Sequence, residues 1–333
     1  MAKKNVKDTE YLFISARLRS MERNLLTAAR MERMIDAPTA EDAAKVLSEI
    51  GYNEFSPASE AELSQALAAE RERTFQDLYR FVPDKAVVDV FRVKYDYHNA
   101  KTVLKARAMG VDGSRLLVDA GRVPTERLAA AIEEGTLEAL PPVMAGAVQE
   151  ALEVLSTTGD PQRSDFILDD AYFREMLQAA EDTGSSFLKR YVQATIDAAN
   201  LRSAVRSLRM HKDGDFLRRV LFDGGTIPVD RVLAAALGGS LEDLYRPTVF
   251  RAAAEAGTAA LESGRLTAFE KACDDAVTAM VSGAKGIPFG VEVVIAYLAA
   301  KEIEFTAVRV IMSGRMAGIS GEMIRERLRE SYV

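Results

Sequence analysis

The chain has 333 residues, and its 43 lysines and arginines against 50 aspartates and glutamates give a formal net charge of −7. Hydrophobic residues make up 48% and charged residues 28% of the chain, which is typical of globular proteins and excludes a disordered or fibrous chain. The negative charge argues against nucleic-acid binding through a general cationic field, and the single cysteine excludes an internal disulfide and favours a reducing compartment.

The N-terminal segment and the most apolar run of the chain are both too short to cross a membrane. Only the short run 11–16 is apolar near the N-terminus, whereas a signal peptide needs a longer one. The run 287–300 is interrupted by Glu292, and a spanning helix needs about 20 apolar residues. We therefore expect a mature N-terminus, no transmembrane segment and a cytoplasmic location.

Helix-forming residues dominate the composition, and alternating β-branched runs are nearly absent, so the sequence predicts an all-α fold. Two capping patterns predict helix starts at Thr39 and Ser59. Helix ends are predicted at Gly51, Gly110, Gly184, Gly214 and Gly238. The first predicted helix carries one apolar stripe that should pack against another helix, formed by Tyr11, Ile14, Leu18, Met21, Leu25 and Ala28.

A segment of a predicted long helix, residues 96–105, recurs further along the chain. Asp96 and Asn99 correspond to Asp197 and Asn200 in the second copy. A weaker third copy at 303–309 keeps the hydroxyl, apolar and basic positions but loses the asparagine. Each copy is followed by a glycine-containing break and a second helix start, at residues 122–126, 226–230 and 318–322.

The spacing of these copies predicts the architecture. A period of about one hundred residues is too long for a common solenoid repeat, which spans roughly 20 to 50 residues. Each copy also has an upstream helical partner, at residues 8–82, 143–183 and 247–283. We therefore predict three quasi-equivalent helical bundles around a pseudo-threefold axis with a central hollow. Their predicted boundaries are 1–140, 141–246 and 247–333.

Sequence motifs for catalysis are missing. The chain has neither the glycine-rich phosphate loop nor the dinucleotide-binding glycine pattern, so it is not expected to bind ATP. Its two histidines, His98 and His211, are not spaced as zinc ligands of a hydrolase, and His98 is expected to be structural or to face a partner. We predict no cofactor, no metal and no enzymatic activity.

Two acidic pairs resemble part of the magnesium-binding Asp-Asp-x-x-Asp pattern of prenyl-transfer enzymes. Asp169–Asp170 and Asp274–Asp275 both lack the third acidic ligand. We interpret the first pair as a helix N-cap and the second as part of a solvated helix face.

The repeated polar and basic positions are the candidate functional residues. Asp96, Asn99, Asp197 and Asn200 are poor residues for helix interiors, and we expect them to form fixed hydrogen bonds between neighbouring helices rather than to contact a partner. A cationic stripe runs beside them and is either a solvated face or a partner-binding surface, formed by Lys101, Lys105, Arg202, Arg206, Arg209 and Arg309.

Several segments carry a resemblance to a known family. They are the opening 11–19, the run 95–102, and Tyr172–Phe173 leading to 187–192 and 196–202. In order and spacing they resemble the C subunits of the archaeal and bacterial V-type ATP synthases, which are related to a subunit of the eukaryotic proton pump. The resemblance covers essentially the whole chain, although position 100 is alanine where the family usually has a larger aliphatic residue.

The resemblance implies a funnel-shaped, pseudo-threefold protein without an active site. Such a protein sits on the cytoplasmic side of the proteolipid ring and receives the tip of a central shaft formed by the D and F subunits. We expect a monomer in isolation, a role in coupling ATP turnover to ion transport, and no nucleic-acid partner. The alternatives are a free-standing helical scaffold that binds peptides or helices in a groove, and an all-α enzyme.

Overall fold

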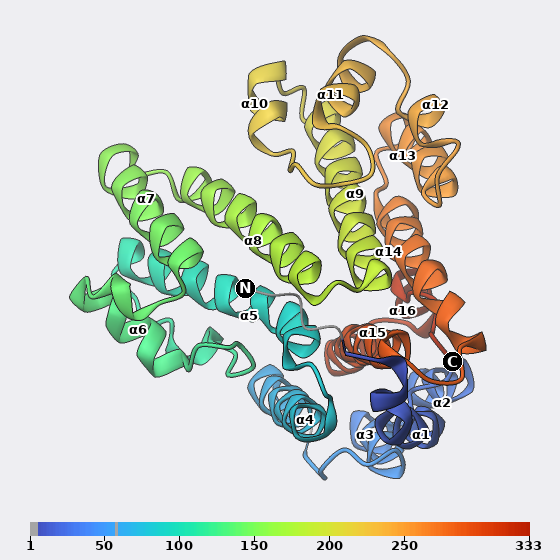
Figure 1. The fold of residues 1–333 in the computed structure, drawn as a ribbon. Coiled ribbons are helices and arrows are strands. Elements are labelled where there is room, and N and C mark those ends of the chain that lie inside the picture. Colours follow the sequence, from blue (N-terminus) through green and yellow to red (C-terminus); the bar gives the residue numbers. More distant parts are fainter. Residues whose placement is uncertain (1–5, 57–58) are drawn as a thin grey trace.

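The computed structural model describes residues 6–56 and 59–333 (Figure 1). Its regular elements are all helical, and no strand occurs in these two ranges. The all-α class predicted from the composition is thus confirmed. Over the same ranges, no helix combines the length and the apolarity that crossing a membrane requires.

Three long helices form the frame of the molecule, and each directly follows another long helix. The frame helices are α5 (Lys85–Met109), α9 (Ser186–Arg209) and α15 (Val291–Met316). The helices that precede them are α4 (Glu60–Phe81), α8 (Pro161–Thr183) and α14 (Thr267–Ser282). Figure 1 shows α5 running alongside α8. In the same way α9 packs on α14, and α15 packs on α4. Each frame helix thus contacts the helix that precedes the next frame helix, and the last one contacts the helix that precedes the first, so the packing is cyclic.

Shorter helices cover this frame. Two of them pack on α5 and α8, namely α6 (Thr125–Glu134) and α7 (Pro142–Thr158). Around α9 lie α10 (Gly214–Arg219), α11 (Val229–Gly238), α12 (Leu241–Tyr245) and α13 (Arg251–Ser263). Against α15 pack α1 (Leu12–Met21), α2 (Ala28–Asp36), α3 (Ala40–Glu49) and α16 (Gly321–Arg327). The 3₁₀ helices are Asp8–Tyr11, Glu22–Asn24, Ser114–Leu116, Leu137–Ala139 and Gly283–Gly286.

The apolar cores explain how the frame holds together. One core contains the N-terminal halves of all three long helices. The C-terminal half of each long helix has a core of its own, shared by α5 with α6 to α8, by α9 with α11 to α14, and by α15 with α2 to α4. The long helices are therefore joined at one end and packed separately at the other. The proposed boundaries at residues 140 and 246 stay a prediction.

The predicted helix signals are correct at most positions. Thr39 accepts a hydrogen bond from the N–H of Asp42 at 3.1 Å, and Ser59 accepts one from the N–H of Glu62 at 3.2 Å. Gly110 ends α5 in the left-handed conformation, with a φ of 63° that favours glycine.

Two local predictions are wrong. Gly214 begins α10 rather than ending a helix, because α9 already stops at Arg209 and His211 takes the left-handed turn with a φ of 52°. The first apolar stripe does not belong to one helix. α1 ends at Met21, and a 3₁₀ turn separates it from α2, although Leu18 and Leu25 both remain in the shared core. The stripe does pack on another helix, α15.

Candidate functional site

Two buried polar residues of α5 hold the loop that follows this helix. The amide of Asn99 donates to the carbonyl oxygen of Val118 at 2.8 Å and accepts from the N–H of the same residue at 2.8 Å. Asp96 accepts from the N–H of Val123 at 3.0 Å and from Nε of Arg122 at 2.6 Å. Both side chains are fully buried, so these bonds satisfy groups that water cannot reach.

The corresponding residues of α9 form the same arrangement. Asn200 donates to the carbonyl oxygen of Phe222 at 2.8 Å and accepts from its N–H at 2.8 Å. Asp197 accepts from the N–H groups of Thr226 at 3.1 Å and Ile227 at 3.3 Å. The repeated Asp and Asn thus bind the backbone of a loop, where the sequence suggested bonds between neighbouring helices.

A glycine lies against the aspartate in each copy. A Cβ atom on Gly121 would overlap the carboxylate of Asp96, and one on Gly225 would overlap the carboxylate of Asp197. Glycine is therefore required at both positions by close approach, because a side chain would push the loop away from the helix. Burial raises the pKa of both aspartates above the ordinary range, and their hydrogen-bond donors offset this only in part.

The cationic stripe of α5 is paired with carboxylates of α8. The ammonium of Lys101 lies 2.6 Å from Asp169, and that of Lys105 lies 2.6 Å from Asp165. The two lysines are four residues apart, and so are the two aspartates. Each lysine therefore lies one helical turn from the other on α5 and faces one aspartate on α8. These cations therefore have partners within the chain.

The cationic stripe of α9 repeats this pattern against α14. Arg202 lies 3.0 Å from Glu270 and also pairs with Asp274, while Arg206 lies 2.7 Å from Glu270. The sequence identified the basic residues but not their acidic partners, which lie 64 to 72 residues further along the chain. A partner-binding role of Lys101, Lys105, Arg202 and Arg206 stays a proposal, as does that of Arg309.

The third copy uses a different chemistry. Arg309 of α15 donates a hydrogen bond to the hydroxyl of Ser64 on α4 at 3.3 Å, where the equivalent Lys105 and Arg206 pair with carboxylates. Two turns earlier, Lys301 is only 6% exposed and lies 2.9 Å from Glu70 and 2.5 Å from Glu304. The α4–α15 interface is therefore held by a buried charge network.

The same network joins the N-terminal helices to α15. Glu304 accepts hydrogen bonds from the hydroxyl of Tyr52 at 2.7 Å and from the N–H of Leu26 at 2.8 Å. Burial and the neighbouring Glu304 raise the pKa of Tyr52 well above its usual range, so the phenol stays a donor. One signal of this network is visible in the sequence, namely a lysine and a glutamate three residues apart that directly follow the apolar run 287–300.

A cavity of about 270 Å³ lies where the three long helices meet the C-terminal segment. Its wall is braced by polar contacts between helices. Glu302 of α15 accepts from the hydroxyl of Tyr95 at 2.7 Å and pairs with Lys94 of α5. Arg329 lies 2.6 Å from Asp274, the partner of Arg202. The remaining lining residues that carry hydroxyl groups are Tyr191, Thr195, Thr278 and Thr306.

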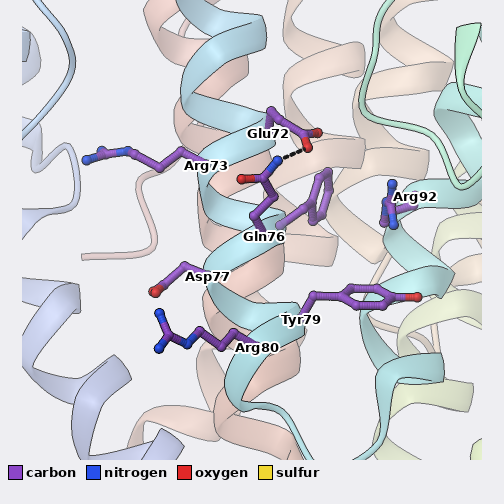
Figure 2. A pocket seen from close by; sticks show the side chains of 8 residues that line it. Glu72, Arg73, Gln76, Asp77, Tyr79, Arg80 and Arg92 are labelled. Carbon is purple, nitrogen blue, oxygen red and sulfur yellow. Dashed lines mark hydrogen bonds between the residues drawn. The ribbon is translucent and has the colours of Figure 1, made fainter.

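A second cavity of about 660 Å³ lies along α4 (Figure 2). Figure 2 shows that its side chains do not converge on one point, since Arg73 and Arg80 extend to one side of α4, while Arg92 and Tyr79 lie on the other. Arg73 is paired with Glu70, and Arg92 donates to the carbonyl of residue 120 at 3.2 Å. Both arginines are thus engaged in contacts within the chain.

The acidic pairs serve as ion-pair partners. Asp169 and Asp170 lie within α8, whose N-cap is Asp160, so the interpretation as an N-cap was wrong. Asp169 pairs with Lys101, and Asp274 pairs with arginines. In the described ranges, no group of three His, Cys, Asp or Glu residues is arranged to hold a metal ion.

Comparison with protein families gives a match over nearly the whole chain. Residues 14–327 match the model of the family described as ATP synthase (C/AC39) subunit. The match covers α2 to α16 completely, together with all three long helices and their partners.

Individual relatives agree with this match. The chain is 26% identical to the C subunit of the V-type sodium ATPase of Enterococcus hirae, over 97% of this chain and 99% of that protein. It is 26% identical to the C subunit of the A-type ATP synthase of Methanocaldococcus jannaschii, over 96% of this chain and 86% of that protein. It is 27% identical to the C subunit of the V-type ATP synthase of Thermus thermophilus, over 92% of this chain and 94% of that protein.

Proposed function

Because the chain belongs to the ATP synthase C/AC39 subunit family, we propose that it is the central-stalk component of a V-type rotary ATPase or ATP synthase. In this role it couples a shaft of the D and F subunits to the proteolipid ring of the membrane sector and so contributes to ion transport. It needs no active site or cofactor of its own. Its place is the cytoplasmic side of the membrane, where it is held by the complex.

The observation that supports this role is the braced cavity between the long helices. A coupling protein must pass torque from one partner to another without deforming. The cavity wall joins α5 to α15 through Glu302, and α9 to α14 through the pair of Arg202 and Asp274. Because the packing of the frame is cyclic, a load applied inside the cavity is shared by all three long helices.

The chemistry of the cavity suits a polar partner. Charged side chains in its wall are already paired, and hydroxyl groups such as those of Thr195 and Thr306 supply neutral hydrogen-bond partners. A shaft tip that enters would replace water at these groups. Steric and hydrogen-bond contacts, rather than net charge, would then fix its position.

The proposal is tested by purifying the intact complex from native membranes with a tag on this chain. We expect the D and F subunits and the proteolipid to co-purify, and the isolated chain to show no ATP hydrolysis. Recovery of the chain without these proteins would favour a free-standing scaffold. ATP hydrolysis by the pure chain would contradict a purely coupling role.

The position of the shaft is tested by filling the cavity. Thr306→Arg places a long cation at the cavity wall, so we expect at least about tenfold weaker binding of the D and F subunits. Ser156→Arg on α7 is the matched control, because this exposed hydroxyl also bonds a carbonyl of its own helix but lies away from the cavity. Equal binding by the two variants would reject the cavity as the seat of the shaft.

The cationic residues are tested separately. Reversing Lys105 or Arg206 to glutamate would set like charges opposite Asp165 or Glu270, so neutral substitutions are cleaner. If the stripe binds the shaft, Lys105→Gln, Arg206→Gln and Arg309→Gln combined should weaken binding more than neutralising Arg23 and Arg265. Equal effects would contradict shaft binding by the stripe and leave it only its contacts between helices of this chain.

A further inference from the structure

A groove of about 900 Å³ lies between α7 and α8 on one side and α10 with the residues after it on the other. It is distinct from the braced cavity, since the two share no lining residue. The α7 side of the groove is mostly apolar, with Val143, Ala147 and Val154 on one helix face. Phe166 and Ile167 of α8 continue this apolar surface. Val143 is 38% exposed, so the described residues leave this part of the groove uncovered.

Gly146 lies on this face in the first half of α7. A glycine inside a helix costs roughly 0.5–1 kcal/mol relative to alanine, because it has more backbone freedom to lose on folding. Packing against the described residues does not require it, since a Cβ atom at this position would point into open space. The glycine therefore keeps the groove open at this point.

Two other glycines inside helices are explained by packing. A Cβ on Gly314 of α15 would lie 2.8 Å from the side chain of Ile324, which comes from α16. A Cβ on Gly257 of α13 would lie 3.0 Å from Val205 and 3.2 Å from Phe269. In both cases, an aliphatic or aromatic side chain of another helix sits against the glycine. Gly146 leaves a comparable space for a side chain of another helix, but no described side chain of this chain occupies that space.

Away from α7, the groove carries more cations than anions. The charged lining residues of α8, α10 and the segment after α10 are Arg163, Arg174, Arg218, Arg219, Asp170 and Asp223. Although Arg163, Arg174 and Arg218 have carboxylate neighbours within the chain, their side chains are still 55%, 64% and 62% exposed. The α7 side has only one charged lining residue, Glu150. The groove is thus apolar along one wall and rich in accessible guanidinium groups along the other.

We propose that this groove seats an amphipathic helix of another component of the rotary assembly. The apolar face of that helix places an aliphatic or aromatic side chain against Gly146, and its carboxylates face the arginines of α8 and α10. This inference rests on membership of the rotary complex but not on the shaft binding in the braced cavity. The two sites are therefore open to separate tests.

The test uses a photoreactive benzoyl-phenylalanine at Val143 in the intact complex from native membranes. We expect an adduct with one segment of another protein of the complex, in which apolar residues recur at helical spacing beside acidic ones. A matched probe at Thr306 reports on the braced cavity. Thr306 adducts without a Val143 adduct would reject the groove proposal and leave the coupling role standing. Loss of the chain from the complex would reject the coupling role itself.

Substitution of the glycine supplies the second arm. Gly146→Leu places a leucine side chain in the open space beside α7. Because leucine favours helices more than glycine does, the variant should fold at least as well as the parent. We expect the Val143 adduct to fall at least about tenfold. Gln149→Leu, also on the exposed surface of α7 but outside the groove, should leave the adduct unchanged within about twofold. An equal fall in both variants would overturn the proposal.

The identity of the captured segment is equally decisive. An adduct with lipid, with a second copy of this chain or with a segment lacking helical spacing would contradict a helix of another component. Combined Arg218→Glu and Arg219→Glu should lower the adduct by about fivefold if the partner presents carboxylates. An unchanged or increased yield in that variant would overturn the charge assignment.

Discussion

The interfaces of the first two long helices differ in chemistry from that of the third. Lys105 and Arg206 pair with carboxylates at the surface, where their side chains are 45% and 55% exposed. Lys301 of α15 pairs with Glu70 and Glu304 at 7% exposure. Exposed pairs are screened by water and stabilise little, whereas a buried charge that loses its partner is strongly destabilising. Helix contacts at equivalent positions can thus differ greatly in their contribution to the free energy of unfolding.

The polar residues that bind the loops also distinguish α5 and α9 from α15. Asn99 and Asn200 bind the loops that follow α5 and α9, while the equivalent position on α15 is Ile303. At the third copy, Ile303 lines a small cavity together with Ser331 and Tyr332 of the C-terminal segment. α15 thus has an isoleucine in place of the loop-binding asparagine, and its buried polar contacts are those of the network of Lys301, Glu304 and Glu70.

The largest expected effect comes from breaking the buried network. Lys301→Ala leaves the buried Glu304 without a counter-charge and leaves Glu70 with only its pair to Arg73, so we expect the free energy of unfolding to fall by about 3–5 kcal/mol. Urea denaturation followed by circular dichroism measures this change. Exchanging all three charged residues for apolar ones of similar size should recover much of the loss. A fall below about 1 kcal/mol for Lys301→Ala would show that the network is open to water.

The next effect tests whether the two loop-binding asparagines are equivalent. Asn99→Ala removes the partner of the N–H and carbonyl of the partly buried Val118, and Asn200→Ala removes that of the buried Phe222, so each should cost about 2–4 kcal/mol. The same denaturation experiment compares them. The two losses should agree within about 1 kcal/mol, because the bond lengths match. A large difference would mean that the two loops are held by other contacts.

Smaller effects are expected for the exposed ion pairs. Lys105→Gln and Arg206→Gln each remove a partly exposed charge, so each should change the free energy of unfolding by about 1 kcal/mol or less. The effect should shrink further in high salt, which screens surface charges. Thermal unfolding at low and high salt gives the comparison. A loss as large as that of Lys301→Ala would remove the distinction between the interfaces.

The smallest change concerns a reporter in the core that α9 shares with α11 to α14. Cys273 on α14 is fully buried, and burial raises the pKa of its thiol to about 12. The thiolate is therefore almost absent near neutral pH, and a thiol reagent should react only after the core opens. Rapid labelling of the native chain would show that this core opens independently. Labelling that follows global unfolding, and speeds up in Lys301→Ala, would show that the network also stabilises the core around α9.

The sequence alone determined the helical class, the positions of the long helices and their repeated Asp and Asn residues. These features depend on residues close together in the chain, where propensity and spacing are direct signals. Thr39 and Ser59 cap helices as predicted, because a cap is a bond between residues three apart. The family resemblance could be read for the same reason, since motif order is a property of the chain.

The tertiary structure decided what the repeated residues contact. Lys101 pairs with Asp169 and Arg202 pairs with Asp274 across 68 and 72 residues, and nothing in the local pattern shows these pairings. The closure of the frame by α4 on α15 is likewise set by packing between distant segments, as is the open space at Gly146. Residues far apart in sequence meet only when the apolar faces of their helices are buried together, so their contacts follow from the packed fold.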